Sequence, residues 1–317
     1  MRKIRIKFVD VGPGFIPERN LCYRLLKRHY DLELSDTPDY LFCGGLGHAH
    51  LRYETLVKIA MIGENVVPDF NCFDYAFGFD HLSFGDRYLR LPLYVRYGEY
   101  AALADRTPPQ REDLLNRSFC SFVVSNARQA DPLRTHFFEE LSKYKRVDSG
   151  GRYLNNIGGP VADKAAFCRR YKFNIAFENS VSPGYVTEKI MQPLSWFSLP
   201  IYYGDPLIES EFNPTSFVRV KDAADVARAI DEIIRLDRND DEYLARLTAP
   251  CLAKPHGAYE AAFEKFLVDI VERPLSAAKR LNSYGYQPSL RQHFRRLEKL
   301  ASGLRLPLKL AAKLRLA

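Results

Sequence analysis

The chain of 317 residues carries 46 Lys and Arg against 39 Asp and Glu, a formal net charge of +7, and 46% of its residues are hydrophobic. This composition is typical of a globular chain, and the length suits two α/β domains joined by a connecting segment rather than one small core. The sequence shows no bilayer-spanning apolar run, no hydrophobic leader and no zinc-type spacing among its six cysteines, so we expect a cytoplasmic protein with reduced cysteines.

Short strands and one helix are predicted in the first block of the chain. Apolar runs of strand length lie at residues 4–11, 40–43, 58–62, 76–79 and 88–91. Apolar residues at helical spacing predict a helix over about 19–29. The polar stretch 97–117 contains two adjacent prolines and interrupts the pattern, so we interpret it as a linker or an excursion.

The second block again alternates strands with helices. Strands are predicted over residues 119–125, 173–177, 199–203 and 216–220. Helices are predicted over 131–144, 162–171, from Tyr185 onward and 223–236. This alternation in both blocks predicts an α/β fold with two doubly wound domains that face a cleft. We place the domain ranges at 1–117, 118–265 and 266–317.

The last 42 residues, 276–317, carry the excess of positive charge. They hold ten Lys or Arg and one acidic residue, which leaves 36 basic and 38 acidic residues in the first 275. Leu297, Leu300 and Leu304 recur there at helical spacing among basic residues, which predicts a basic amphipathic helical tail. Such a helix suits an anionic membrane surface. A solvated tail and a helix packed on the body are the alternatives, and few aromatic residues are present to stack on nucleic acid.

The segment 171–190 is the most informative motif in the chain. Alternating apolar residues over 173–177 predict a buried strand, a Pro-Gly turn follows, and a helix is expected to begin near Tyr185. At that position Tyr185, Glu188 and Lys189 would share one face of the first turn. Backbone amides, the helix dipole and an ammonium group then predict a site for a phosphate-linked ligand. An ordinary βα unit with a solvated Glu-Lys pair is the alternative.

Several metal and nucleotide motifs are missing from the sequence. No two aspartates stand at DxD spacing, and neither a Walker A loop nor a GxGxxG sequence follows a predicted strand. We therefore expect no metal ion, and we disfavour an NTPase or a dehydrogenase. The glycine-rich segment 44–50 contains His48 and His50, which would need a third ligand to bind zinc and which we interpret as loop residues.

Five stretches of the body resemble one family of enzymes. The longest reads FNIAFENS and then GYVTEKI within residues 173–190, and it is similar to the signature of the α1,3/1,4-fucosyltransferases, glycosyltransferase family ten. The stretches at 63–80 and 86–92 resemble bacterial members of that family, and those at 122–126 and 200–206 resemble strands of its donor-binding domain. This resemblance implies a GT-B fold that transfers L-fucose from GDP-β-L-fucose to a sugar hydroxyl with inversion.

The resemblance also implies roles for individual residues. Glu64 follows Gly63 at the end of a predicted strand and matches the position of the family's catalytic base, which takes the acceptor proton. Without a metal, the leaving diphosphate must meet cations and hydrogen-bond donors, which we assign to Lys189, Tyr185 and the helix amides. Glu188 is expected to accept hydrogen bonds from ribose or fucose hydroxyls or to stabilise an oxocarbenium-like transition state.

Further donor-binding residues are expected around the same strand ends. Arg152 stands two places before the arginine of some relatives and is expected to reach the phosphates, since this chain has Leu154 at the later position. Glu178 and Asn179 end the buried strand, and ligand binding and turn stabilisation are equal alternatives for them. Three polar residues follow the strand 119–125 at the end where α/β sheets bind ligands. These are Ser125, Asn126 and Arg128.

Two other functions are open at this point. One is a GT-B transferase with another donor such as GDP-mannose, because phosphate-binding features do not distinguish the sugar. The other is a non-catalytic, membrane-associated glycan-binding protein. For the fucosyltransferase we expect an N-acetylglucosamine or glucose unit of an oligosaccharide or lipid-linked glycan as acceptor, bound by residues 1–117. Residues 118–265 are expected to bind GDP-fucose. Part of 266–317 is expected to pack on the N-terminal domain, and 291–317 to contact the inner membrane face.

Overall fold

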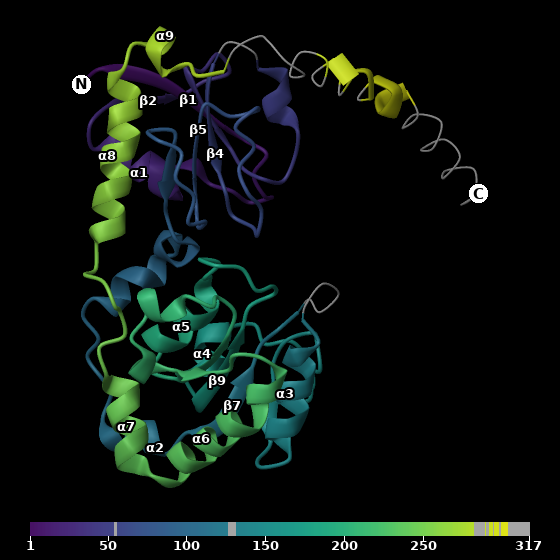
Figure 1. Ribbon diagram of the computed structural model, residues 1–317, viewed down its shortest axis with the longest axis vertical. Coiled ribbons are helices and arrows are strands. Elements are labelled where there is room, and N and C mark those ends of the chain that lie inside the picture. Colours follow the sequence, from purple (N-terminus) through teal and green to yellow (C-terminus); the bar gives the residue numbers. More distant parts are fainter. Residues whose placement is uncertain are drawn as a thin grey trace. The chain divides into compact units, whose positions relative to one another are not determined.

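The computed structural model describes residues 1–53, 56–125, 131–281, 289, 292–293, 295–297 and 299–303. The chain divides into two compact units, whose elements are labelled in Figure 1. Unit 1 contains Met1–Phe77, Ser83–Leu89 and the described residues from Glu264 onward. Unit 2 contains Gly78–Leu82 and Arg90–Phe263. The domain boundaries predicted after residues 117 and 265 stay predictions.

Unit 1 is organised around a six-stranded sheet with the strand order β2-β1-β3-β4-β5-β6. The strands are β1 (Lys3–Val9), β2 (Asp31–Leu34), β3 (Tyr40–Cys43), β4 (Val57–Met61), β5 (Tyr75–Gly78) and β6 (Tyr88–Arg90). The strand pairs from β2 to β5 are parallel. Every residue of β3, β4 and β5 is buried, as expected for interior strands of a parallel sheet covered on both faces.

Short helices and one long helix accompany this sheet. They are η1 (Pro17–Arg19), α1 (Leu21–Lys27), η2 (Ala49–Arg52), α8 (Ala258–Glu272) and α9 (Leu275–Ala278), where η denotes a 3-10 helix. Of α8, the residues from Glu264 onward belong to unit 1. Figure 1 shows α8 beside α1. The Tyr30 hydroxyl donates to Glu272 at 2.5 Å, and Arg28 donates to Glu264 at 3.0 Å. The segment that follows α1 is thus hydrogen-bonded to both ends of the stretch of α8 from Glu264 to Glu272.

Asp74, just before β5, fastens the chain beyond α9 to unit 1. Its fully buried carboxylate accepts hydrogen bonds from the backbone N–H groups of Lys58 (2.8 Å), Arg280 (2.6 Å) and Leu281 (2.7 Å). The Lys279 ammonium contacts the same carboxylate at 3.1 Å. A buried carboxylate needs hydrogen-bond partners, and Asp74 takes three of its contacts from residues 279–281. The chain up to residue 281 therefore belongs to the folded body.

The basic tail is only partly described. Residues 292–293, 295–297 and 299–303 are helical, and the side chains of Leu297 and Leu300 are 46% and 62% exposed. Leu304 and the residues after it lie outside the described residues, and the predicted amphipathic tail beyond residue 303 stays a prediction. No helix of the described residues combines the length and the apolar content needed to cross a membrane.

Unit 2 contains a five-stranded parallel sheet with the order β11-β10-β9-β7-β8. The strands are β7 (Ser118–Phe122), β8 (Val147–Ser149), β9 (Tyr171–Phe177), β10 (Leu199–Tyr203) and β11 (Val218–Arg219). The central strand β9 is buried at every residue. Its Phe173, Ile175 and Phe177 enter one hydrophobic core with Phe122 of β7 and Ile201 of β10, which fixes the position of the residues that follow each strand.

The helices of unit 2 complete the α/β arrangement. The α-helices are α2 (Arg111–Leu115), α3 (Leu133–Ser142), α4 (Lys164–Cys168), α5 (Glu188–Ser195), α6 (Val226–Arg238) and α7 (Asp240–Thr248). The 3-10 helices are η3 (Leu93–Arg96), η4 (Gly98–Leu103), η5 (Ile208–Ser210), η6 (Pro214–Ser216) and η7 (Ala223–Asp225). Two parallel sheets with helices confirm the predicted α/β class.

The structure differs from the predicted elements mainly at sheet edges and helix ends. The sequence pattern does not predict β2 or β8, because each is a short edge strand that carries polar residues instead of an apolar run. The pattern also misses α7 and α8. The stretch 97–117, interpreted as a linker, contains η4 and α2, and the helix predicted over 162–171 is reduced to α4 because β9 begins at Tyr171.

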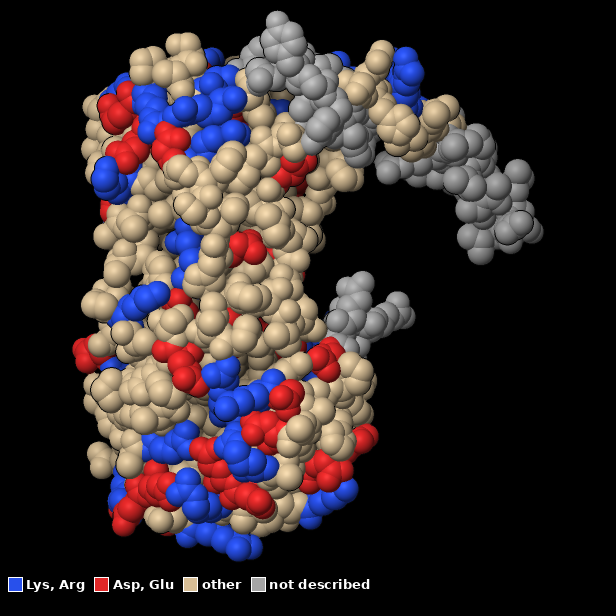
Figure 2. All heavy atoms as spheres, in the orientation of Figure 1, with Lys and Arg blue, Asp and Glu red and all other residues tan. Residues whose placement is uncertain are grey.

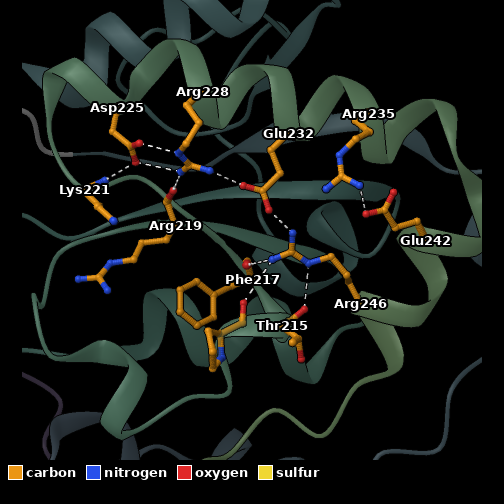
Figure 3. Close-up of polar contacts among 11 residues, drawn as sticks. Thr215, Phe217, Arg219, Lys221, Asp225, Arg228, Glu232, Arg235, Glu242 and Arg246 are labelled. Carbon is orange, nitrogen blue, oxygen red and sulfur yellow. Dashed lines mark hydrogen bonds and ion pairs between the residues drawn. The ribbon is translucent and has the colours of Figure 1, made fainter.

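A network of charged side chains fixes the helices α6 and α7 on unit 2. Figure 2 shows acidic and basic groups intermixed on this face. In Figure 3, Glu232 of α6 lies between Arg228 and Arg246, and Arg246 of α7 also donates to the backbone carbonyl of Thr215 at 3.0 Å. A second bond from Arg246 reaches the carbonyl of Phe217. These cations are paired within the protein, so the network stabilises the segment before β11 and offers no unsatisfied charge to a ligand.

Candidate active site

The turn between β9 and α5 carries the motif of the sequence analysis. Thr187 is the N-cap of α5, and its hydroxyl accepts a hydrogen bond from Lys189 N, so the helix begins at Glu188. Tyr185 therefore precedes the helix, and the prediction that it shares a helical face with Glu188 and Lys189 is wrong. Its side chain is 3% exposed and packs edge-on against Phe79, with ring centroids 5.1 Å apart.

Two buried carboxylates hold this turn from neighbouring strands. Glu178, directly after β9, accepts hydrogen bonds from Thr187 N (2.8 Å) and from the Thr187 hydroxyl. Asp205, two residues after β10, accepts a hydrogen bond from Gly184 N at 2.9 Å. Gly184 has φ +84, and a Cβ atom there would lie 2.5 Å from the carbonyl oxygen of Phe79, so only glycine fits. The turn is consequently fixed at both of its ends.

Lys189 forms a buried ion pair with Glu178. Its Nζ lies 3.0 Å from Glu178 Oε2 and 3.1 Å from the Thr187 hydroxyl, and the Glu178 side chain is fully buried. Burial would lower the pKa of Lys189, but Glu178 and then Glu188 raise it above the ordinary value, so the ammonium stays charged. Burial raises the pKa of Glu178, and Lys189 opposes this effect. An ammonium group has three N–H donors, and these two contacts use two of them.

Arg134 of α3 adds a second cation at the end of β9. Its Nη2 donates to the carbonyl oxygens of Phe177 (2.8 Å) and Glu178 (2.7 Å) and to Asn179 Oδ1 (3.0 Å). The residue is 1% exposed, and its Nε and Nη1 have no hydrogen-bond partner within the described part of the chain. Burial lowers the pKa of Arg134, and the Glu178 carboxylate opposes that shift. Guanidinium groups bind anions through two nitrogen atoms at once, and Nε and Nη1 of Arg134, both buried from solvent, are the two donors left for such a contact.

Glu188 lies beside Lys189 at the start of α5. The Glu188 carboxylate is 3.8 Å from the Lys189 ammonium, and its side chain is 24% exposed. Burial would raise the pKa of Glu188, but Lys189 and then Lys164 hold it below the ordinary value, so it is ionised. Burial and the interaction with Glu188 raise the pKa of the Tyr97 hydroxyl, which therefore stays protonated and donates a hydrogen bond to this carboxylate.

The remaining predicted donor residues lie at different places in unit 2. Asn179 and Ser125 are exposed and follow β9 and β7, the strands that pair at the centre of this sheet. Arg152 is exposed, and the structure shows no contact that brings it to Lys189. Asn126 and Arg128 lie outside the described residues. The structure therefore brings Glu178, Asn179 and Lys189 together around Arg134. Among the described residues no hydrogen bond or ion pair joins Arg152 to this cluster, so its role as a phosphate ligand stays a prediction.

Glu64, the predicted base, belongs to unit 1. It lies three residues after the end of β4, and its side chain is exposed. Because β1, β3, β4 and β5 are parallel neighbours, the loops that follow them share the edge of the sheet on which Glu64 lies.

Four site residues were not predicted from the sequence. They are Arg134, Thr187, Asp205 and Tyr97. Thr187 could have been found, because a threonine directly before a Glu-Lys helix start is a typical N-cap. The other three act across long stretches of sequence, and no local pattern identifies their partners. As for metals, no cluster of three or more His, Cys, Asp or Glu side chains among the described residues is arranged to hold an ion.

Replacing Glu178 tests the buried ion pair. Glu178→Gln keeps a hydrogen-bonding side chain against Thr187 but removes the charge opposite Lys189. We expect the free energy of unfolding to fall by about 3 kcal/mol, because a buried ammonium is left without its counter-ion. The matched change Glu188→Gln should cost less than about 1 kcal/mol, since that carboxylate is partly exposed. Urea denaturation measures both values, and equal losses for the two variants would show that the pair with Glu178 is not the stabilising one.

Comparison with known proteins identifies the family. The model of the alpha-(1,3)-fucosyltransferase FucT N-terminal domain matches residues 6–97, and that of the glycosyltransferase family 10 (fucosyltransferase) C-terminal region matches residues 115–248. The alpha-(1,3)-fucosyltransferase FucT of Helicobacter pylori is 35% identical over 268 residues, which are 73% of this chain and 56% of that protein. The chain thus spans little more than half the length of this relative.

Solved structures agree with this assignment. A crystal structure of an alpha1,3-fucosyltransferase with GDP-fucose matches with a TM-score of 0.72 and 29% identity, over 86% of this chain and 92% of that one. A second alpha1,3-fucosyltransferase structure matches with the same TM-score of 0.72 and 32% identity, over 84% and 90% of the two chains. With its two parallel sheets of the GT-B class, the chain belongs to glycosyltransferase family 10, the fucosyltransferases.

Proposed function

We propose that this chain transfers L-fucose from GDP-β-L-fucose to a hydroxyl of an N-acetylglucosamine or glucose unit in a glycan, as an inverting α1,3-fucosyltransferase. One observation carries the proposal. The segment that resembles the family signature is folded around a buried ion pair between Lys189 and Glu178, with the incompletely paired guanidinium of Arg134 at the same strand end. A solved relative that contains GDP-fucose supports the donor.

The cations of unit 2 would receive the diphosphate of the donor. Lys189 has one N–H donor left after its contacts with Glu178 and Thr187, and Arg134 has two unused nitrogen atoms among the described residues. Both side chains are anchored by protein contacts before the ligand arrives, which is the arrangement that stabilises negative charge on a leaving group. Because Nε and Nη1 of Arg134 are buried, the atoms that cover them have to move aside for the diphosphate. Arg134 replaces Arg152 as our candidate for the second phosphate ligand, because Arg134 is anchored at the end of β9.

The chemical step needs a base and a cation stabiliser. In the proposed step the acceptor hydroxyl oxygen forms a bond to C1 of fucose, the bond from C1 to the β-phosphate oxygen breaks, and Glu64 takes the hydroxyl proton. GDP leaves with the bonding electrons, and its charge is met by Lys189 and Arg134. Glu188 is an ionised carboxylate held by Lys189 and Tyr97, and in this role it would favour the positive charge that develops on the sugar ring. We propose that no metal ion takes part.

The variant Glu64→Gln tests the assignment of the base. We expect it to bind GDP like the wild type and to lose at least about 100-fold in kcat, because the amide cannot accept the proton. The measurement is fucose transfer to N-acetyllactosamine in EDTA, with GDP affinity determined by calorimetry. Glu33→Gln, which changes a surface glutamate of unit 1 paired with Lys3, is the matched control and should keep full activity. Unchanged turnover of Glu64→Gln would contradict the role of Glu64.

We also propose that the tail lets the enzyme work on a lipid-linked glycan at a membrane surface. The excess positive charge of the chain lies in residues 276–317, and the described part of that segment includes exposed Leu297 and Leu300 on helical turns. Since the contacts of Asp74 end at Leu281, a chain shortened after Leu281 retains the folded body of unit 1.

Binding to lipid vesicles tests the role of the tail. The full chain should sediment with vesicles that contain anionic phospholipid, should not sediment with neutral vesicles, and should be released by high salt. The chain shortened after Leu281 should stay in the supernatant. If the shortened chain sediments as well as the full chain does, the tail is not the membrane contact.

A further inference from the structure

Asp10, the residue after β1, has a left-handed backbone conformation with φ +57°. Few residues other than glycine enter this region, and aspartate does so when its side chain forms local hydrogen bonds. The surroundings of Asp10 therefore have to hold this conformation in place. Here the Asp10 carboxylate accepts hydrogen bonds from Ala49 N (2.7 Å), His50 N (3.0 Å) and His50 Nδ1 (2.6 Å), all in the segment that follows β3.

Two glycines make room for this carboxylate. A Cβ atom at Gly44 would lie 2.4 Å from the backbone oxygen of Asp10, and one at Gly47 would lie 2.5 Å from Asp10 Oδ1. Neither position therefore tolerates another residue without a shift of the chain. The glycine-rich segment 44–50, which the proposed reaction does not use, is thus shaped to bring His50 against Asp10.

The contact with Asp10 determines which nitrogen of the His50 ring carries the proton. Burial would raise the pKa of the Asp10 carboxyl, but the hydrogen bonds from His50 and Ala49 hold it below the ordinary value, so Asp10 is ionised. A carboxylate can only accept, and Nδ1 must therefore be the N–H donor in this bond. In the neutral ring Nε2 then presents a lone pair. No described residue forms a hydrogen bond with this nitrogen, and the ring lies tilted against that of Phe73, with ring centroids 5.0 Å apart.

His50 lies on the edge of the unit 1 sheet that also carries Glu64. The sheet order places β3 directly between β1 and β4, so the segment with His50 is flanked by the chain after β1, which holds Asp10, and by the chain after β4, which holds Glu64. A purely structural role for Asp10 would be to cap η2 by accepting hydrogen bonds from the backbone N–H groups of Ala49 and His50. Any residue at position 50 would allow this role. It does not account for the third hydrogen bond, which fixes the tautomer of the His50 ring.

We propose that His50 binds the acceptor, its Nε2 accepting a hydrogen bond from a hydroxyl of the acceptor sugar, and that Asp10 is the positioning residue that fixes the ring. The inference rests on the proposed function, since it assigns a role toward the second substrate of that reaction. It makes the segment 44–50 a determinant of acceptor specificity in unit 1, separate from the donor cluster of unit 2.

Two amide variants separate this role from a structural one. The side chain of His50→Asn places an amide donor near the position of Nδ1 and keeps the contact with Asp10, but it lacks Nε2. His50→Gln places its amide near Nε2 and loses the contact with Asp10. At saturating GDP-fucose, we expect His50→Asn to raise the KM for N-acetyllactosamine about three- to tenfold, with kcat, GDP affinity and Tm near wild-type values. His50→Gln should show a smaller rise in KM and a lower Tm.

The order of the two variants decides the outcome. If His50 only stabilises the loop through Asp10, His50→Gln should have the larger loss of activity and of Tm. The acceptor KM of His50→Asn would then stay within about twofold of the wild-type value, and this result would overturn the inference. A loss of kcat by His50→Asn at unchanged KM also overturns it, because the ring would then act in the chemical step. His136→Asn, at an exposed position of α3, is the control and should change nothing. Wild-type protein that transfers no fucose would overturn the proposed function itself, a result distinct from either of these.

Discussion

The negative charge of a buried glutamate at the end of the central strand of unit 2 has to be compensated by a nearby cation and hydrogen-bond donors. Glu178 follows β9, is fully buried, and is compensated by Lys189 and by the N-cap residue Thr187. Loss of one partner from such a pair is far more costly than the pair itself is stabilising. The need to keep both partners of Glu178 in contact with it therefore fixes the turn between β9 and α5. It also fixes the start of α5 at its N-cap Thr187 and the direction of the Lys189 ammonium group. Arg134 completes the arrangement by holding the backbone of Glu178 from α3.

The two units present their candidate functional residues in the same topological position. In each unit parallel strands end at one edge, and the residues just beyond the strands carry the chemistry: Glu178 after β9 in unit 2, and Asp10 and Glu64 after β1 and β4 in unit 1. Both edges contain a glycine at a close backbone approach, Gly184 in one and Gly44 in the other. The buried strands supply rigidity, so these short polar segments hold strained or charged groups at little further cost.

Local sequence patterns predicted the interior strands of both sheets. They did not predict contacts between residues that are far apart in the sequence. Strands β4 and β9 are buried at every residue and are mostly apolar in sequence, with apolar residues alternating along β9, whereas the edge strand β2 is short and half charged. The start of α5 was predicted near Tyr185, whereas the helix begins at Glu188. The prediction followed the spacing of apolar residues, which contains no information on the N-cap Thr187. Arg134 lies 44 residues from Glu178, and His50 lies 40 residues from Asp10. Only the fold brings these pairs together, so no spacing rule could have identified them.

The central claim is that the protein's own cations at the end of β9, without a metal ion, receive a diphosphate. Calorimetric titration of the wild-type chain in EDTA with GDP and with guanosine tests it most directly, because the two ligands differ only in the diphosphate. The account predicts that GDP binds at least about 100-fold more tightly than guanosine, since charge-assisted hydrogen bonds from Lys189 and Arg134 act on GDP alone. Equal affinities for the two ligands, or GDP binding that appears only when a divalent metal is added, would contradict it.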